Sequence, residues 1–93
     1  FGIHAAGKPR EVTVKLTSWA AELVREQKWH PSQKILKDKH DLVVVQFVLP
    51  NTTEFKRWLL GFGRYAAVIR PKSFANEMRE ELKAAARHYT GKS

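Results

Sequence analysis

The feature that most constrains the fold is a nearly unbroken apolar stretch at residues 42–49 (LVVVQFVL). It is far shorter than the roughly 20 residues that a membrane-spanning helix needs, and its valines favour a strand. A strand this apolar is typical of the middle of a sheet, where neighbouring elements bury it. Because side chains alternate along a strand, we expect the odd-numbered positions to face the core. These positions are Val43, Val45, Phe47 and Leu49.

Three weaker patterns precede this stretch. Residues 11–17 (EVTVKLT) alternate apolar with polar positions, which predicts a half-buried strand. Residues 18–26 place their apolar positions at helical spacing. Residues 29–36 contain a proline, so we expect them to form an edge strand, and the polar residues 37–41 are expected to form the turn that follows.

The second half of the chain predicts two helices and a strand. Residues 50–54 (PNTTE) carry a helix-start signal, an asparagine and a glutamate three positions apart. The helix that follows is expected to end at Gly61 or Gly63, before a short strand at residues 65–69. Ser73 then begins a last amphipathic helix. Three aromatic residues on helical apolar stripes are expected in the core: Trp19, Phe55 and Trp58.

The resulting order of elements, βαββαβα, indicates an α+β fold. It matches the ferredoxin-like βαββαβ arrangement with an additional C-terminal helix, in which helices cover one face of an antiparallel sheet with strand order 4-1-3-2. The second face of the sheet would carry Thr13 and Lys15 beside the even-numbered positions of residues 42–49. Two alternatives are open for that face: it binds a partner, or the C-terminal helix folds back over it.

Positive charge is concentrated in two parts of the chain. There are 17 lysines and arginines against nine acidic residues, a formal net charge of +8. Residues 28–40 contribute +3 of this excess and residues 56–72 contribute +5. A localised charge points to a phosphate-bearing ligand or an acidic neighbouring domain, and a solvated basic face with no specific ligand is the alternative. The lysines expected to form the basic surface are Lys28, Lys34, Lys37, Lys39, Lys56 and Lys72.

Five further side chains are candidates for contacts with a ligand or with another domain. Arginine binds carboxylate or phosphate through two parallel hydrogen bonds, which favours the three arginines of the second segment. A histidine and a glutamine near the expected edge strand are added to them. The five are Arg57, Arg64, Arg70, His30 and Gln33. In the expected topology the lysines at 34, 37 and 39 share one end of the sheet with Arg64, while Arg70 lies toward the other end.

Several kinds of chemistry find no support in the sequence. The chain has no cysteine, which excludes disulfides, thiol catalysis and iron–sulfur ligation. Its four histidines lack metal-ligand spacing, so we expect no metal site. There is no glycine-rich phosphate loop and no serine–histidine–acid set, so we expect neither an enzyme nor a cofactor. The expected central strands also lack the exposed aromatic residues on which RNA bases stack in ferredoxin-like RNA-binding modules.

Three motifs together resemble a known family. The first is a helix at residues 20–26 (AAELVRE) followed by WHPSQ at residues 29–33. The second is EFKRWLLGFG at residues 54–63, and the third is AVIRP at residues 67–71, followed by an amphipathic helix. In this order and spacing they resemble the C-terminal extension (WCX) domain of bacterial WYL-domain transcriptional regulators, over residues 11–90.

The resemblance implies a cytoplasmic, multi-domain regulator that forms a homodimer. In such a protein an N-terminal winged helix-turn-helix domain reads DNA, a WYL domain senses an effector, and the C-terminal domain supports dimerisation and the effector response. Residues 1–10 would then be a connector or the tail of a preceding WYL domain, and residues 11–93 the WCX-like domain. The partners implied are a WYL domain of the same chain or of a second subunit, and a nucleotide or single-stranded nucleic acid as effector.

The leading hypothesis is therefore a non-catalytic regulatory and dimerisation module that assists effector sensing through a basic surface. The alternative is a stand-alone basic module that binds single-stranded nucleic acid or nucleotides directly. A third hypothesis, an acylphosphatase-like enzyme, needs a phosphate-binding loop between the first strand and the first helix. Residues 16–19 (LTSW) offer no such loop, which disfavours it.

Overall fold

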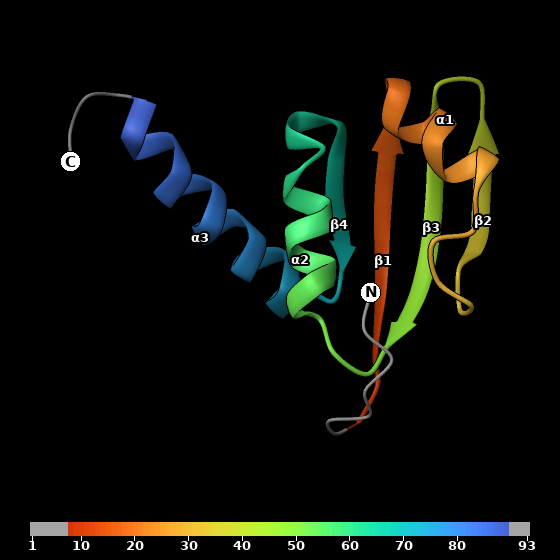
Figure 1. Cartoon of the computed structure of the whole chain (residues 1–93), viewed down its shortest axis with the longest axis horizontal. Helices are drawn as coiled ribbons and strands as arrows, with labels where there is room; N and C mark the ends of the chain where they lie inside the picture. The colour runs from red at the N-terminus through yellow and green to blue at the C-terminus, as the bar shows by residue number, and fades with distance from the viewer. Residues whose placement is uncertain (1–7, 90–93) are drawn as a thin grey trace.

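The computed structural model describes residues 8–89, which form a four-stranded sheet with helices packed on one side (Figure 1). The first half of this region contains β1 (Arg10–Thr17), α1 (Ser18–Glu26), β2 (Lys34–Lys39) and β3 (Leu42–Leu49). The second half contains α2 (Thr53–Leu60), a short 3-10 helix (Gly63–Tyr65), β4 (Ala66–Arg70) and α3 (Lys72–Tyr89). No helix in this region is both long and apolar enough to cross a membrane.

The sheet is antiparallel throughout, with the order β2-β3-β1-β4. Read from the other edge this is 4-1-3-2, so the α+β prediction with a C-terminal helix is confirmed. The apolar stretch forms β3, which pairs with β1 along its whole length, from Arg10 opposite Leu49 to Thr17 opposite Leu42. Helix α1 packs on β1 and β3, while α2 packs on β4 and α3.

The core lies between the sheet and the helices. The predicted inward positions of β3, from Val43 to Leu49, are fully buried, and so are Val12, Val14 and Leu16 of β1. An aromatic cluster closes this layer from the α2 side. The ring of Phe47 lies 5.0 Å from that of Phe55 and 5.9 Å from that of Trp58. Phe55 is buried as predicted, and the half-buried Trp58 packs against the core.

The expectations for Trp19 and for the bounds of the second strand are wrong. Trp19 is not a core residue: its side chain is 48% exposed and lies over the 3-10 turn, with its ring 5.2 Å from that of Phe62 and 5.8 Å from that of Tyr65. The second strand is shifted along the chain, because residues 29–33 form a turn and β2 runs from Lys34 to Lys39. The turn that joins β2 to β3 is correspondingly short, at residues 40–41.

Helix α3 packs on the rest of the domain through its first half only. Phe74 and Met78 are buried, and Phe74 stacks on Phe55 at a ring separation of 6.1 Å. Residues 79–89 are all exposed. The helix lies beside β4 and α2 and points away from the other strands (Figure 1). It therefore does not fold back over the outer face of the sheet, which was one of the two alternatives.

Candidate functional site

The outer face of the sheet gathers lysines from the edge strand β2. Residues directly opposite each other in a sheet share a face. Lys34 pairs with Gln46, Lys37 with Val44, and Lys39 with Leu42. Because the odd-numbered positions of β3 face the core, its even-numbered positions and their β2 partners face outward. All three lysines are exposed.

An irregularity in β2 makes this arrangement possible. Lys34 and Lys37 are three positions apart, so in a regular strand they would point to opposite faces. The register shifts between Ile35 and Lys37, where an extra residue is accommodated. The shift returns Lys37 to the face that carries Lys34. Sequence reasoning could not find this bulge, since the pairing partner determines where it occurs.

The two strands on the other side of β3 add to the same face. Lys15 of β1 pairs with Val44 and with Ala67 of β4. A second register shift, next to Thr13, brings Arg70 opposite Thr13. We call the five cations Lys15, Lys34, Lys37, Lys39 and Arg70 the basic sheet face. One row across the sheet runs from Lys34 through Gln46 and Thr13 to Arg70.

The dimensions and charge of this face suit an extended anion. Neighbouring strands are about 4.8 Å apart, so the row from Lys34 to Arg70 spans about 14 Å. None of the five cations forms an ion pair with another residue in the described part of the chain. Glu11, opposite Val48, is the one acidic residue among the described strand positions of this face. The face therefore carries a clear net positive charge.

The side chains between the cations are small or aliphatic. Val44 is half-buried, Val48 is 39% exposed, and Thr13 is fully buried despite its position on this face. No aromatic residue occurs at the described strand positions of the face. Bases of a nucleic acid would therefore find no aromatic ring to stack on at these positions.

The structure does not bring the three candidate arginines together. Arg70 belongs to the basic sheet face, whereas Arg57 is exposed on α2, in the helical layer. Arg64 lies in the 3-10 helix, where its Nη2 donates a hydrogen bond to the Tyr65 hydroxyl at 3.2 Å. The expected separation of Lys34 and Arg70 at opposite ends of the sheet is wrong, because the register places both in one row.

The remaining lysines lie outside this face. Lys28 follows α1 and Lys72 begins α3, and both are exposed. Lys56 of α2 is partly neutralised, because its ammonium group lies 3.4 Å from the carboxylate of Glu77. Lys15, which the sequence placed on the outer face without assigning it to the basic surface, is the cation of the basic sheet face that the sequence analysis missed. Its position opposite Val44 was the available signal.

The other two candidates, His30 and Gln33, hold the turn between α1 and β2. The Gln33 amide nitrogen donates to the carbonyls of Val24 at 3.1 Å and Gln27 at 3.2 Å, and its oxygen accepts from the Trp29 backbone N–H at 2.7 Å. His30 Nδ1 accepts from the Ser32 backbone N–H at 3.1 Å and lies 2.7 Å from the Ser32 hydroxyl. Both side chains therefore have partners within the turn.

The burial of His30 makes the stability of the domain depend on pH. Burial lowers the pKa of His30 below its ordinary value of 6.5. The donors around Nδ1 act in the same direction, since a proton there would break their hydrogen bonds. The unfolded chain then binds the proton more readily than the folded one. The contribution of neutral His30 to the free energy of unfolding is fully present above about pH 6.5. It is lost as the pH falls from there toward the lowered pKa.

We expect this loss to disappear in His30→Asn, whose side-chain oxygen can still accept a hydrogen bond but does not titrate. Urea unfolding between pH 7.5 and pH 5 measures the effect. The matched control is His40→Asn, which makes the same substitution at an exposed histidine in the turn after β2. Equal pH dependence in the wild type and in His30→Asn would contradict the prediction.

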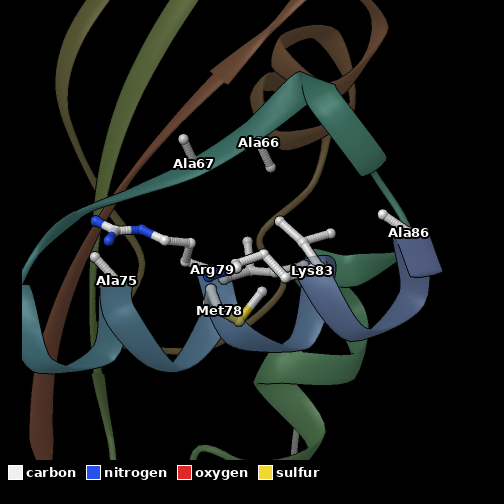
Figure 2. Close-up of a pocket in the computed structure, with 9 residues that line it drawn as sticks. Ala66, Ala67, Ala75, Met78, Arg79, Lys83 and Ala86 are labelled. Carbon is white, nitrogen blue, oxygen red and sulfur yellow. The ribbon is translucent and has the colours of Figure 1, made fainter.

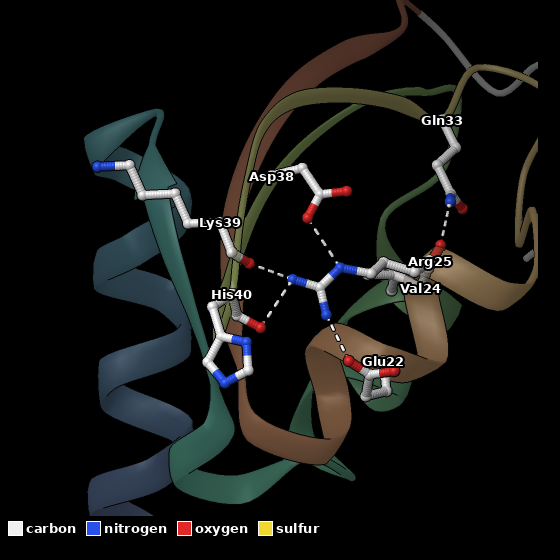
Figure 3. Close-up of polar contacts among 7 residues, drawn as sticks. All are labelled: Glu22, Val24, Arg25, Gln33, Asp38, Lys39 and His40. Carbon is white, nitrogen blue, oxygen red and sulfur yellow. Dashed lines mark hydrogen bonds and ion pairs between the residues drawn. The ribbon is translucent and has the colours of Figure 1, made fainter.

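Arg25 of α1 fixes the hairpin that carries the lysines (Figure 3). Its Nε donates to Asp38 at 2.8 Å and its Nη1 to Glu22 at 2.5 Å. Its Nη2 donates to the backbone carbonyls of Lys39 and His40. The hydrogen bond to Asp38 raises the pKa of Arg25. Asp38 is thereby held on the helix side of β2, while its neighbours Lys37 and Lys39 face outward.

Residues 8–89 contain no group of three or more His, Asp or Glu side chains that could hold a metal ion. The family model described as the WCX domain matches residues 8–86, which is most of the chain. No curated protein matches the sequence.

Proposed function

Because this chain belongs to the WCX domain family, the C-terminal extension of WYL regulators, we propose that it is a non-catalytic regulatory module that assists effector sensing through its basic sheet face. The effector would be a nucleotide or a single-stranded nucleic acid whose phosphates contact this face. The observation that supports the proposal is the gathering of five cations from three strands on one open face, with two register shifts that align them.

Phosphate is the chemistry that this face suits best. Lysine and arginine side chains attract phosphates whatever the base sequence, and the described strand positions of the face hold no aromatic ring on which bases could stack. The apolar side chains of β3 keep the cations apart, so one compact carboxylate could reach few of them. A chain of phosphates could contact several along the row of about 14 Å.

The regulatory step would be a change in docking. A WYL domain of the same chain or of a second subunit would share the effector with the basic sheet face. An effector that binds the docked arrangement more tightly shifts the population toward it and so reorients the DNA-reading domains. Dimerisation of the regulator through these domains is part of the same proposal. The proposal also includes a cytoplasmic location, where a DNA-binding regulator would reach its DNA.

The salt dependence of binding tests the proposal on the 93-residue chain. Each phosphate contact to a single strand contributes about −0.7 to the slope of log K against log salt concentration. We expect a short single-stranded oligonucleotide to bind at low salt. The double substitution Lys15→Gln with Lys37→Gln should reduce the magnitude of the slope by about 1.4. Fluorescence anisotropy at four salt concentrations measures it.

The control makes the same change in charge elsewhere. Lys28→Gln with Arg57→Gln removes two exposed cations that lie outside the basic sheet face. It should change the slope much less than the first pair. Equal slopes in the two variants would show that binding depends on net charge alone and not on the basic sheet face. No binding of the oligonucleotide at low salt would also contradict the proposal. In the full regulator, the Lys15–Lys37 pair should weaken the effector response while the control pair preserves it.

A further inference from the structure

A second surface feature lies away from the basic sheet face, between α3 and β4. Here the structure contains a groove of about 350 Å³, which we call the α3–β4 groove (Figure 2). Ala66 and Ala67 of β4 form one wall, and side chains of α3 form the other. The lining is apolar apart from Arg79 and Lys83, and it contains no acidic side chain. The alanines leave room for bulky groups of a partner.

The groove exists because α3 leaves the sheet at an angle. The helix is anchored by its buried residues Phe74 and Met78, and residues 79–89 are exposed. It points away from the other strands (Figure 1). Leu82 continues the apolar stripe of Met78 one turn later but is 42% exposed. More than two turns of helix therefore present an apolar stripe without a covering surface among the described residues. A partner that fills the groove would bury it.

The opposite wall has a specific hydrogen-bonding capacity. β4 is an edge strand that pairs only with β1 in the described sheet. The backbone N–H and C=O groups along its outer edge have no strand partner in residues 8–89. An open strand edge facing a helix across an apolar groove is the geometry in which domains bind an extended peptide as an added strand.

We propose that the α3–β4 groove binds an extended segment of a partner protein as a fifth strand on β4, with apolar side chains against Met78 and Leu82 and acidic side chains near Arg79 and Lys83. At about 3.3 Å per residue, a strand opposite the five residues of β4 covers about 17 Å. The proposal goes beyond the proposed function and does not depend on it, because it uses a different surface and a different ligand chemistry.

Charge disfavours the occupants that the residues of this sequence could supply. Residues 1–7 (FGIHAAG) and 90–93 (TGKS), the parts of the chain outside the described range, contain no acidic residue. A second copy adding its own β4 (AAVIR) would bring another arginine toward Arg79 and Lys83. Lys83 lies 3.8 Å from Glu80, but both side chains are more than half exposed, so this pair screens the charge only weakly.

A synthetic peptide tests the proposal on the 93-residue chain. The probe is a capped nonapeptide with valine alternating with threonine in the centre and two glutamates at each end. In an NMR titration we expect its binding to shift the amide signals of residues 66–70 and 78–86. A peptide with lysines in place of the glutamates should bind with an affinity at least about tenfold lower. N-methylation of the backbone edge that faces β4 should abolish binding.

Variants locate the site and keep the test decisive. Arg79→Glu with Lys83→Glu should weaken the glutamate peptide by about tenfold or more, because both exposed cations become repulsive. Lys28→Glu with Arg57→Glu makes the same charge change elsewhere and should leave the affinity almost unchanged. Absence of shifts at residues 66–70 at millimolar peptide overturns the proposal. Equal binding of the N-methylated peptide also overturns it. So does self-association of the chain that depends on its concentration and shifts the same amide signals, because a second copy would then occupy the groove.

Discussion

Replacing Phe47 with alanine is expected to lower the free energy of unfolding by about 3–5 kcal/mol. Phe47 is fully buried in the central strand β3, where its ring contacts those of Phe55 and Trp58. The substitution removes both aromatic contacts and leaves a cavity between the sheet and α2. A domain of 93 residues has a total stability of about 5–14 kcal/mol, so this one change would remove a large part of it.

The neighbouring residue provides the control for this prediction. Val48 follows Phe47 in the strand but lies on the outer face and is 39% exposed. Val48→Ala should cost less than about 1 kcal/mol, since it loses strand propensity and little burial. Urea unfolding followed by tryptophan fluorescence measures both variants. Equal losses would mean that the two faces of β3 are equally covered, which would contradict an open basic sheet face.

The alternation of buried and exposed positions could be predicted because it depends on local sequence. The inward residues of β3 follow from the period of two, and Phe55 follows from the helical stripe of α2. The prediction that Trp19 lies in the core was wrong for a physical reason. Its helix α1 is short, and the interior is already filled by Ala20, Ala21 and Val24, so the large ring packs at the surface against Phe62 and Tyr65.

The candidate site was harder to predict because it depends on pairing between distant segments. Lysines were visible at 34, 37 and 39, but their common face requires the register shift in β2. Arg70 joins them only through a second shift beside Thr13. Neither shift has a signal in the local sequence, since no glycine marks it. Bulges change which residues share a face, and a one-residue error moves every later side chain to the other side.

Helix α3 also shows that local sequence does not determine how distant segments pack. Its stripe from Phe74 to Tyr89 has regular apolar spacing, which predicts an amphipathic helix but does not say how much of the stripe is covered. The structure buries only Phe74 and Met78, while Tyr89 is 92% exposed. The reason is that the neighbouring β4 has only five residues and the sheet ends there. The part of α3 that extends past this supporting layer, residues 79–89, is therefore left exposed.

Replacing Phe74 with alanine should detach α3, at a cost of about 3–5 kcal/mol. Phe74 is fully buried, stacks on Phe55 and lies under the guanidinium group of Arg10 at 5.1 Å. Arg10 also lies 3.4 Å from Glu77, so the first turns of α3 are held through one small cluster. Hydrogen exchange should show lost protection in residues 72–89 and preserved protection in β1 and β3. Phe74→Leu places an aliphatic side chain at this position and leaves a smaller cavity, so it should cost less than Phe74→Ala.

The same variant separates the two proposed surfaces. The α3–β4 groove needs α3 in place, whereas the basic sheet face is built on β1, β2 and β4 and aligned by β3. The Phe74→Ala variant should therefore no longer bind the glutamate peptide. It should still bind the oligonucleotide, with an unchanged slope of log K against log salt concentration. If α3 stays as protected as in the wild type, contacts other than Phe74 anchor it. If both ligands are lost while the sheet stays protected, the anionic ligand depends on α3, and the basic sheet face is not an independent site.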